Sequence, residues 1–388
     1  MFSVYKRKYE NRKNMKIGIL TVPFNNNYGG YLQAFALLTT LKELGHKPTI
    51  IMYRHKKEKV GIKLKIKFFL KNIIKGIADR RLYPLIYDRE KILAYKGRKM
   101  KEFESHYLIP QTERFYTDEA LEMGCRNCFD AICVGSDQVW RAIYVPNIKN
   151  YFLAFTKGWN LKRYAYAASF GTDEPEYTQQ QRQSCSELIK NFDAISVREV
   201  SAVSVIDSWG CNTANVKTVL DPTLLLKKEQ YLNILDKQKT MAKGKIFCYF
   251  LDKTDIVKDY ISRCTNYANK EILQISDIQV GMNILPSVET WLAYIRDCDL
   301  VITDSFHGTV FSIIMNKPFL VVTNGSRGSA RFVDLLQKFS LRNRIVSKKN
   351  SPESILENTI DWGVVNKKIE LQRQESFKFI KDNFKNDV

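Results

Sequence analysis

The sequence lacks the features that mark several classes of protein. Its longest apolar stretches, such as residues 318–322, fall far below the roughly 20 residues that a membrane-spanning helix needs. Gly and Pro together make up 28 of the 388 residues, which excludes a collagen-like or low-complexity chain. The first 14 residues carry five Lys or Arg but no apolar core, so we expect no secretory signal and a cytoplasmic protein.

Metal-binding and cofactor-binding motifs are scarce as well. The eight cysteines are scattered, and several lie in apolar runs such as residues 132–134, a usage typical of reduced cysteines. The single CxxC pair, Cys125 and Cys128, has neither a second pair nor two nearby histidines to complete a zinc site. The glycine fingerprint of dinucleotide-binding folds is also missing. We therefore expect neither a metal nor a bound cofactor.

Basic charge is abundant and unevenly placed. The net charge is +20, and the stretch from Arg54 to Lys101 alone holds 17 Lys or Arg against 4 Asp or Glu. Such a zone indicates a polyanionic partner: nucleic acid, an acidic membrane surface or an anionic substrate. Because helix-turn-helix, zinc-finger and RNP signatures are absent, we expect no nucleic acid partner.

Within this zone, residues 62–77 have the pattern of a basic amphipathic helix. Apolar residues recur at three- and four-residue spacing, and lysines fill the other faces. Two interpretations remain open. The helix lies on an anionic membrane surface at the inner face of the membrane, or it packs its apolar stripe into the protein and leaves a solvated lysine face.

The order of predicted elements is that of an α/β protein. Residues 16–22 read as a strand, residues 23–30 as a polar, glycine-containing loop, residues 31–44 as a helix and residues 49–53 as the next strand. The same alternation recurs along the chain, which predicts two Rossmann-like domains facing a cleft. We place them at residues 15–226, with a basic helical insertion at about 54–105, and at residues 246–388, ending in a helix; residues 227–245 form the linker region.

Chemistry is expected at the carboxyl ends of the strands, where open α/β sheets bind ligands. His307 follows a predicted strand within the sequence DSFHG. There Asp304 and Ser305 can cap the next helix, and Gly308 leaves room for a ligand. His307 either caps a buried turn or transfers a proton near neutral pH.

Three arginines lie near strand ends in both halves. Arg198 follows the strand AISV, and Arg327 and Arg331 lie in a Gly/Ser-rich segment after a later strand. They are either ordinary ion-pair and loop charges or a clamp for a substrate with several anionic groups.

Two further loops contain polar groups suited to sugars. Asn27 and Tyr28 belong to the NNNYGG loop, which is a plain turn or faces a sugar or phosphate. Asp137 and Gln138 follow Gly135-Ser136 at a strand end, where they serve as turn and cap residues or bind hydroxyls.

Several segments together resemble the polysaccharide pyruvyl transferase family, in order and spacing, between about residues 16 and 341. They are GILTVPFNNNYGGYLQAFALLTTLKELG, AICVGSDQVWR, YAASFG, ISVRE, VLDPTLLL and VITDSFHGTVFSIIMNKPF. The resemblance implies a glycosyltransferase-B-like fold. It also implies catalytic roles for His307 and Arg198, and it matches Arg331 to the family's downstream arginine. Some members carry an arginine two positions before the histidine. Ser305 stands there in this chain, so the anion contact falls to Arg327 or Arg331.

The resemblance further implies the reaction. A pyruvyl group from phosphoenolpyruvate, a co-substrate, is joined to two hydroxyls of one sugar as a cyclic ketal during surface polysaccharide synthesis. Ser305, Gly308, Arg327 and Arg331 would bind the donor, and Asn27, Tyr28, Asp137 and Gln138 the acceptor, which is a sugar or a lipid-linked oligosaccharide. The alternatives are a nucleotide-sugar glycosyltransferase of the same architecture and a non-enzymatic basic scaffold.

Overall fold

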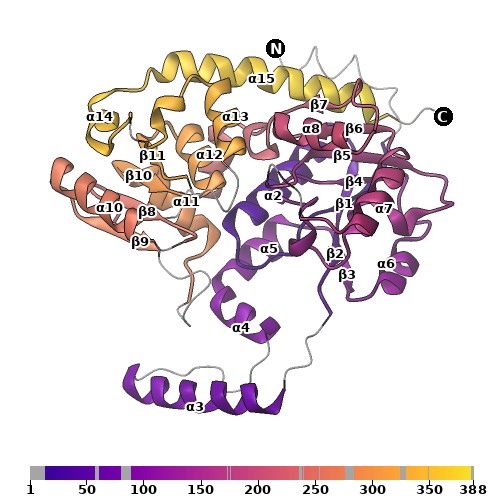
Figure 1. Ribbon diagram of the computed structural model, residues 1–388, viewed down its shortest axis with the longest axis horizontal. Coiled ribbons are helices and arrows are strands. Elements are labelled where there is room, and N and C mark those ends of the chain that lie inside the picture. The colour runs from indigo at the N-terminus through magenta and orange to yellow at the C-terminus, as the bar shows by residue number, and fades with distance from the viewer. Residues whose placement is uncertain are drawn as a thin grey trace.

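The structure is a computed structural model, and two parallel sheets form its framework (Figure 1). It describes residues 14–56, 61–79, 89–172, 174, 176–235, 238, 240–252, 254–275, 284–323, 329–347 and 349–385.

The first sheet has seven strands in the order β3-β2-β1-β4-β5-β6-β7. All neighbouring strands pair in parallel. The strands are β1 (Lys16–Leu20), β2 (Lys47–Tyr53), β3 (Gln111–Phe115), β4 (Ala131–Val134), β5 (Lys162–Ala168), β6 (Ala194–Val197) and β7 (Lys217–Thr218). The central strands β1 and β4 are apolar on both faces, as expected of a sheet covered on both sides.

The helices of this half alternate with its strands. They are α2 (Tyr28–Glu43), α3 (Ile62–Asp79), α4 (Arg89–Lys96), α5 (Lys101–Tyr107), α6 (Asp118–Cys125), α7 (Gln179–Ile189) and α8 (Val200–Ser208). The prediction of a loop over residues 23–30 is wrong for its last three residues, which are helical. Asn27 accepts a hydrogen bond from the backbone N–H of Gly29 and caps α2, so the helix begins three residues before the expected Tyr31.

The second sheet has four parallel strands in the order β11-β10-β8-β9. They are β8 (Ile246–Tyr249), β9 (Ile272–Ile275), β10 (Leu300–Thr303) and β11 (Phe319–Val321). Their helices are α10 (Asp255–Ala268), α11 (Val288–Asp297), α12 (Phe306–Ile314), α13 (Ala330–Lys338) and α14 (Pro352–Glu357). A short helix, α9 (Lys228–Ile234), lies in the predicted linker region.

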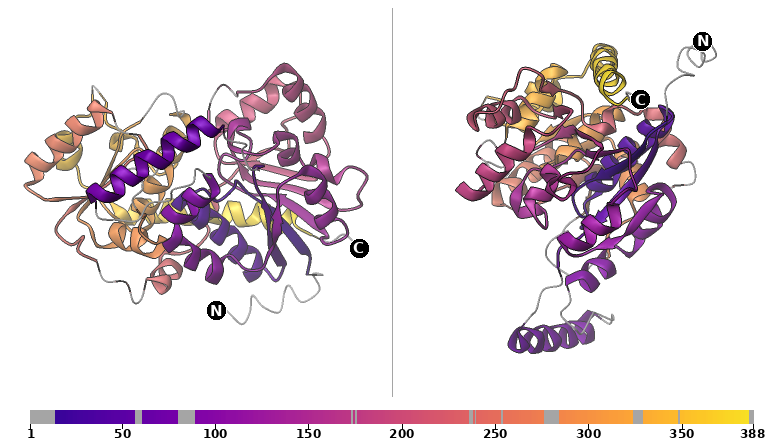
Figure 2. Two further views of the ribbon diagram at one scale, coloured as in Figure 1. Left: turned by 90° about the horizontal axis from the view of Figure 1, so that it is seen from below. Right: turned by 90° about the vertical axis from the view of Figure 1, so that its right-hand side faces the viewer.

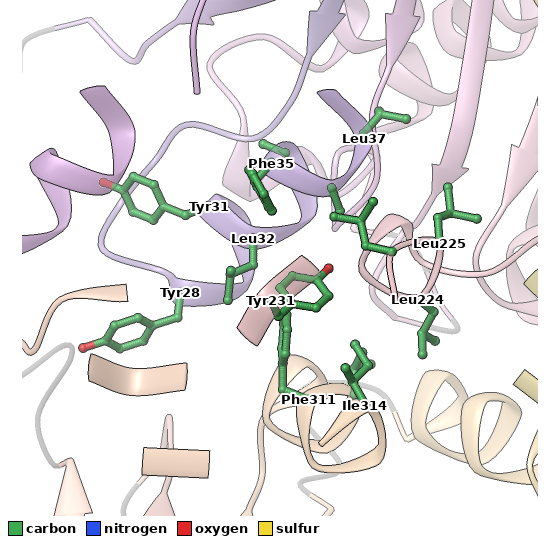
Figure 3. Packing of buried hydrophobic residues seen from close by; sticks show 14 of the residues in the cluster. Tyr28, Tyr31, Leu32, Phe35, Leu37, Leu224, Leu225, Tyr231, Phe311 and Ile314 are labelled. Carbon is green, nitrogen blue, oxygen red and sulfur yellow. The ribbon is translucent and has the colours of Figure 1, made fainter. Parts of the chain in front are cut away.

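The two halves share one apolar core. Figure 3 shows Tyr231 and Phe311 packed beside α2, and the rings of these two residues meet edge to face at 5.0 Å. Tyr28, in the first turn of α2, stacks on Trp291 of α11 at 5.1 Å and donates a hydrogen bond to the carbonyl of Pro286. These aromatic contacts fix the start of α2 against the second half.

The final helix, α15 (Trp362–Asn383), crosses from the second half back to the first (Figure 1). Ser376 on this helix accepts a hydrogen bond from the backbone N–H of Leu220. Phe384, just beyond its end, stacks on Tyr164 of β5 at 4.2 Å. The predicted terminal helix is therefore present, and its last turns complete the core of the first sheet.

Helix α3 stands apart from both sheets in Figure 1 and in the right-hand view of Figure 2. Six of its apolar side chains are exposed: Ile62, Ile66, Phe69, Leu70, Ile74 and Ile77. The interpretation that this stripe packs into the protein is therefore wrong. In the part of the chain that the structure describes, no helix is long and apolar enough to cross a bilayer.

Candidate active site

Polar side chains gather where strands of both sheets end. Asp137 lies just beyond β4, Arg198 and Glu199 directly follow β6, and Asp221 lies just beyond β7. From the other half, His307 lies in the first turn of α12, shortly after β10. All five side chains are buried. The cluster is therefore assembled from the carboxyl ends of strands in both halves, as expected for a ligand site in this class of fold.

Arg198 lies between three carboxylates and an aromatic ring. Its Nη1 donates a hydrogen bond to Oδ2 of Asp221 at 3.0 Å, its Nε lies 3.5 Å from Oε2 of Glu199, and its Nη2 lies 3.8 Å from Oδ1 of Asp137. Its Cζ is 4.2 Å from the centre of the Phe306 ring. Burial opposes the charge, but the three carboxylates outweigh it and raise the pKa of Arg198. The guanidinium is thus a permanent cation.

Asp221 is the most heavily hydrogen-bonded group of the cluster. Its Oδ1 accepts from the backbone N–H of Thr223 at 3.0 Å and from the Thr223 hydroxyl at 2.7 Å. Its Oδ2 accepts from the Ser136 hydroxyl at 3.0 Å as well as from Arg198. Burial alone would raise the pKa of Asp221, but His307 and Arg198 outweigh burial and hold it well below its ordinary range. Asp221 is therefore a fixed anion beside His307.

The His307 ring is held by its two neighbours. Its Nδ1 side faces Gly29 of α2, where any Cβ would overlap the imidazole. Its Nε2 lies 3.6 Å from Oδ2 of Asp221, close enough for electrostatic attraction but longer than a hydrogen bond. Within the described residues Nε2 is buried and has no hydrogen-bond partner. The nitrogen that faces the polar cluster is thus available to a ligand.

Glu199 and Arg331 are the remaining charged groups of the cluster. The Oε1 of Glu199 accepts a hydrogen bond from the Ser169 hydroxyl at 2.6 Å, and burial raises the pKa of Glu199 in spite of the adjacent Arg198. Arg331, near the start of α13, lies with its Cζ 6.0 Å from the centre of the Phe306 ring. Burial, and then the positive charge of Arg198, lower the pKa of Arg331 to about 10. The two guanidinium groups therefore repel each other.

Several buried donors of this cluster are unused. In the described part of the chain, Nε and Nη2 of Arg198, Nε of Arg331 and Nε2 of His307 have no hydrogen-bond partner. A buried polar group without a partner costs about 1–3 kcal/mol. Guanidinium groups form charge-assisted pairs with carboxylate and phosphate. The arrangement therefore fits a ligand with several anionic oxygens, which would also relieve the repulsion between the arginines.

Replacing Asp221 with Asn should reduce stability in a pH-dependent way. Removing one partner of a buried pair costs about 3–5 kcal/mol. Because the pKa of Asp221 is lowered in the folded protein, its stabilising effect is present above the ordinary Asp pKa of about 4 and is lost as the pH falls below it. The difference in unfolding free energy between wild type and variant should shrink by roughly 1 kcal/mol from pH 7 to pH 3.

Urea unfolding at the two pH values measures this difference. Asp259→Asn, on the exposed side of α10, is the matched control and should change stability by less than about 0.5 kcal/mol. A difference for Asp221→Asn that stays constant from pH 7 to pH 3 would contradict the ionised state of Asp221.

Comparison with known families identifies this chain. The family model described as polysaccharide pyruvyl transferase matches residues 27–326, which include Asp137, Arg198, Asp221 and His307. The chain belongs to this family. The resemblance drawn from the sequence motifs is therefore confirmed, and this pyruvyl transferase family member is a transferase of polysaccharide biosynthesis.

The fold of this pyruvyl transferase is similar to those of two solved structures. One is a putative UDP-N-acetylglucosamine 2-epimerase from Listeria monocytogenes, with a TM-score of 0.53, 11% identity, and coverage of 96% of this chain and 97% of that one. The other is the UDP-GlcNAc 2-epimerase from Neisseria meningitidis bound to UDP-GlcNAc, with a TM-score of 0.52, 8% identity, and coverage of 93% and 94%. The expected glycosyltransferase-B-like architecture is thus confirmed. A search of curated proteins found no match.

The pyruvyl transferase brings together only some of the residues predicted from its sequence. His307, Arg198, Arg331 and Asp137 all belong to the buried cluster. The Nδ2 of Asn27 lies 3.4 Å from Oδ2 of Asp137, at the edge of this cluster. Arg327 lies outside the described residues.

Other predicted site residues have structural contacts. Ser305 caps α12 by accepting a hydrogen bond from the backbone N–H of Gly308. A Cβ at Gly308 would meet the Thr303 side chain at 2.6 Å, so the glycine allows α12 to pack closely against the end of β10. Tyr28 points into the core between the two halves, and the Gln138 side chain accepts a hydrogen bond from Arg141. These contacts give Tyr28 and Gln138 packing and structural roles.

Sequence reasoning missed two members of the cluster. Asp221 follows Leu220 within the motif VLDPTLLL, and the sequence does not show which side chains its carboxylate contacts. Glu199 directly follows Arg198, and the two side chains form an ion pair. Asp304, expected to cap α12, instead accepts hydrogen bonds from the backbone N–H groups of Leu251 and Asp252.

Proposed function

We propose that this enzyme transfers the pyruvyl group of phosphoenolpyruvate to two hydroxyls of one sugar, with release of inorganic phosphate. The product is a cyclic ketal on a surface polysaccharide or its lipid-linked precursor. The observation that carries this proposal is the set of buried donors on Arg198, Arg331 and His307 that make no hydrogen bond within the described residues, in a member of this family. A donor substrate with a carboxylate and a phosphate supplies the matching acceptors.

Arg198 and Arg331 act on the anionic groups of the donor. They neutralise the phosphoenolpyruvate charges on binding and the charge that develops on the leaving phosphate, since fixed cations in a buried site stabilise such charge strongly. Phe306 lies against both guanidinium groups and keeps them apart from bulk water. The fork geometry of arginine suits this role better than a lysine would.

His307 acts as the general acid. Its Nε2–H first protonates the methylene carbon of phosphoenolpyruvate, and a sugar hydroxyl then adds to the neighbouring carbon and gives its proton to the deprotonated Nε2. The bond to phosphate then breaks, a second hydroxyl of the same sugar attacks the same carbon, and its proton leaves with the phosphate. Asp221 stabilises the protonated imidazole across the 3.6 Å gap without taking its proton.

The acceptor sugar lies on the side of Asn27 and Asp137. These two side chains are polar, adjacent and at the edge of the buried cluster, where an amide and a carboxylate can bind sugar hydroxyls. Asp137 has a φ of +71°, a left-handed conformation that is uncommon for a residue other than glycine. Such a conformation is consistent with a functional constraint on the direction of this carboxylate.

Ligand-dependent melting tests the donor assignment. Phosphoenolpyruvate should raise the melting temperature of the protein, because a ligand that binds only the folded state stabilises it. UDP-GlcNAc should leave the melting temperature unchanged, and phosphate release should require a glycoside acceptor. Stabilisation by UDP-GlcNAc but not by phosphoenolpyruvate would favour the nucleotide-sugar glycosyltransferase instead.

Arg331→Ala should weaken binding of phosphoenolpyruvate by roughly 10- to 100-fold, because a hydrogen bond to a charged group contributes about 1.5–3 kcal/mol. Arg331→Lys should restore little of this affinity. Isothermal titration calorimetry provides the measurement. Arg342→Ala removes the same charge from an exposed position nearby and serves as the control. Equal affinities in the two Ala variants would exclude Arg331 from the donor site.

A further inference from the structure

Helix α3 presents an apolar stripe that the described residues leave exposed. Six large apolar side chains on this one helix are exposed, from 42% for Phe69 to 76% for Ile77. Elsewhere in the described residues, exposed apolar side chains are spread over many elements. At a rise of about 1.5 Å per residue, the 18-residue helix offers a stripe roughly 27 Å long. A surface of this kind marks an interaction site.

Lysines of α3 flank this stripe on both sides, and one lies within it. At about 100° of rotation per residue, the six exposed apolar residues fall within roughly 140° of the helix circumference. The same geometry places Lys65 beyond one border and Lys67 and Lys71 beyond the other, whereas Lys63 lies between Leu70 and Ile74. The first turn contains no acidic residue, so attraction to an anionic surface is not offset there. An apolar face flanked by basic residues is typical of helices that lie in a bilayer interface.

Charge complementarity distinguishes between three candidate partners for this face: a second copy of the chain, a nucleic acid and a lipid bilayer. In a second copy of the chain, the same lysine rows would meet across the contact and repel each other. Nucleic acid would pair with the lysines but would leave the apolar stripe in water. A bilayer rich in anionic lipids satisfies both features, because the phosphates attract the lysines and the acyl region receives the apolar side chains.

We propose that α3 attaches the protein to an anionic membrane surface, with its apolar stripe inserted at the boundary between headgroups and acyl chains. Figure 1 and the right-hand view of Figure 2 show the helix at one end of the molecule, set off from the two sheets. This attachment goes beyond the proposed reaction, since it concerns where the enzyme works and not what it transfers.

Vesicle sedimentation tests the proposal on the full chain. The wild type should pellet with vesicles of phosphatidylcholine and phosphatidylglycerol far more than with phosphatidylcholine alone. Binding should weaken with salt, because the Debye length falls from about 10 Å at 0.1 M to about 3 Å at 1 M. Replacing Lys63, Lys65, Lys67 and Lys71 with Gln should reduce the affinity at least about tenfold. The double variant Ile66→Ser, Phe69→Ser should also weaken binding, and should do so at every salt concentration.

The matched control removes the same charge from other exposed lysines: Lys157, Lys217, Lys243 and Lys378. It should bind as the wild type does, and both lysine variants should melt at wild-type temperature. Equal vesicle binding by the two lysine variants would overturn the proposal, as would pelleting of the wild type no greater than in a lipid-free blank. A dimer that separates in the Ile66→Ser, Phe69→Ser variant, without vesicle binding, would assign the face to a second copy. Vesicle sedimentation does not depend on catalysis. A negative result would therefore overturn the membrane attachment without contradicting the proposed reaction.

Discussion

His307→Ala is expected to lower the rate of pyruvyl transfer by about 10²–10⁴-fold, the range that general acid catalysis contributes. The Nε2 of His307 makes no hydrogen bond within the described residues and lies 3.6 Å from a fixed anion, Asp221. The two arginines remain charged and in place, so binding of phosphoenolpyruvate should be reduced far less than turnover. A single-turnover measurement of phosphate release separates the two effects.

His307→Gln provides the control for lost packing. It keeps a hydrogen-bond donor and much of the volume beside Gly29 but cannot deliver a proton, so it should be as slow as the Ala variant. If either variant retains more than about a tenth of the wild-type rate, another group supplies the proton.

Gly29→Ala is expected to be almost as damaging, although Gly29 carries no chemistry. A methyl group at this position would overlap the Nδ1 edge of the His307 ring. The ring must turn or the start of α2 must shift, and either movement changes the 3.6 Å contact with Asp221. A displacement of about 1 Å in a catalytic group can cost roughly 10²-fold in rate. Overpacking should also cost about 1–3 kcal/mol of stability.

The adjacent glycine is the matched control. A Cβ at Gly30 would have its nearest neighbour, Nδ2 of Asn27, at 3.6 Å, which is ordinary contact. Gly30→Ala should therefore keep full activity and gain slightly in stability, because Ala loses less entropy than Gly in a helix. Turnover numbers and melting temperatures of the two variants provide the comparison. Equal activity in both would show that Gly29 does not position His307.

The start of α2 shows what the sequence predicts well and where it fails. The apolar run of β1 and the helical spacing after Tyr31 identify both elements and their order. The two glycines before Tyr31 suggest a loop, because glycine is a poor helix former. The structure places them in the first helical turn. The need for Gly29 arises from His307, 278 positions later in the chain, and no local pattern contains that contact.

In the buried cluster, too, local sequence patterns predict some residues, whereas others depend on contacts between distant segments. His307, Arg198 and Arg331 can be predicted from the sequence because each lies after a predicted strand. Asp221 cannot be predicted in this way, because its role depends on contacts with four other side chains, among them Ser136 and Thr223, which donate hydrogen bonds to it. Amphipathic spacing predicted α3 correctly as a helix, but spacing alone does not say whether an apolar stripe is covered. The exposed fractions of the side chains in the structure show that the stripe of α3 is not covered by the described residues.

The contacts of helix α15 determine when the first half of the chain can finish folding. Ser376 accepts a hydrogen bond from the backbone N–H of Leu220. The ring centre of Phe379 lies 6.3 Å from that of Tyr166, and Phe384 stacks on Tyr164. The first sheet thus lacks part of its cover until α15 has been synthesised. Its early strands emerge long before that cover, so the nascent first half cannot reach its final packing on its own, and the two halves mature as a single unit instead of one after the other.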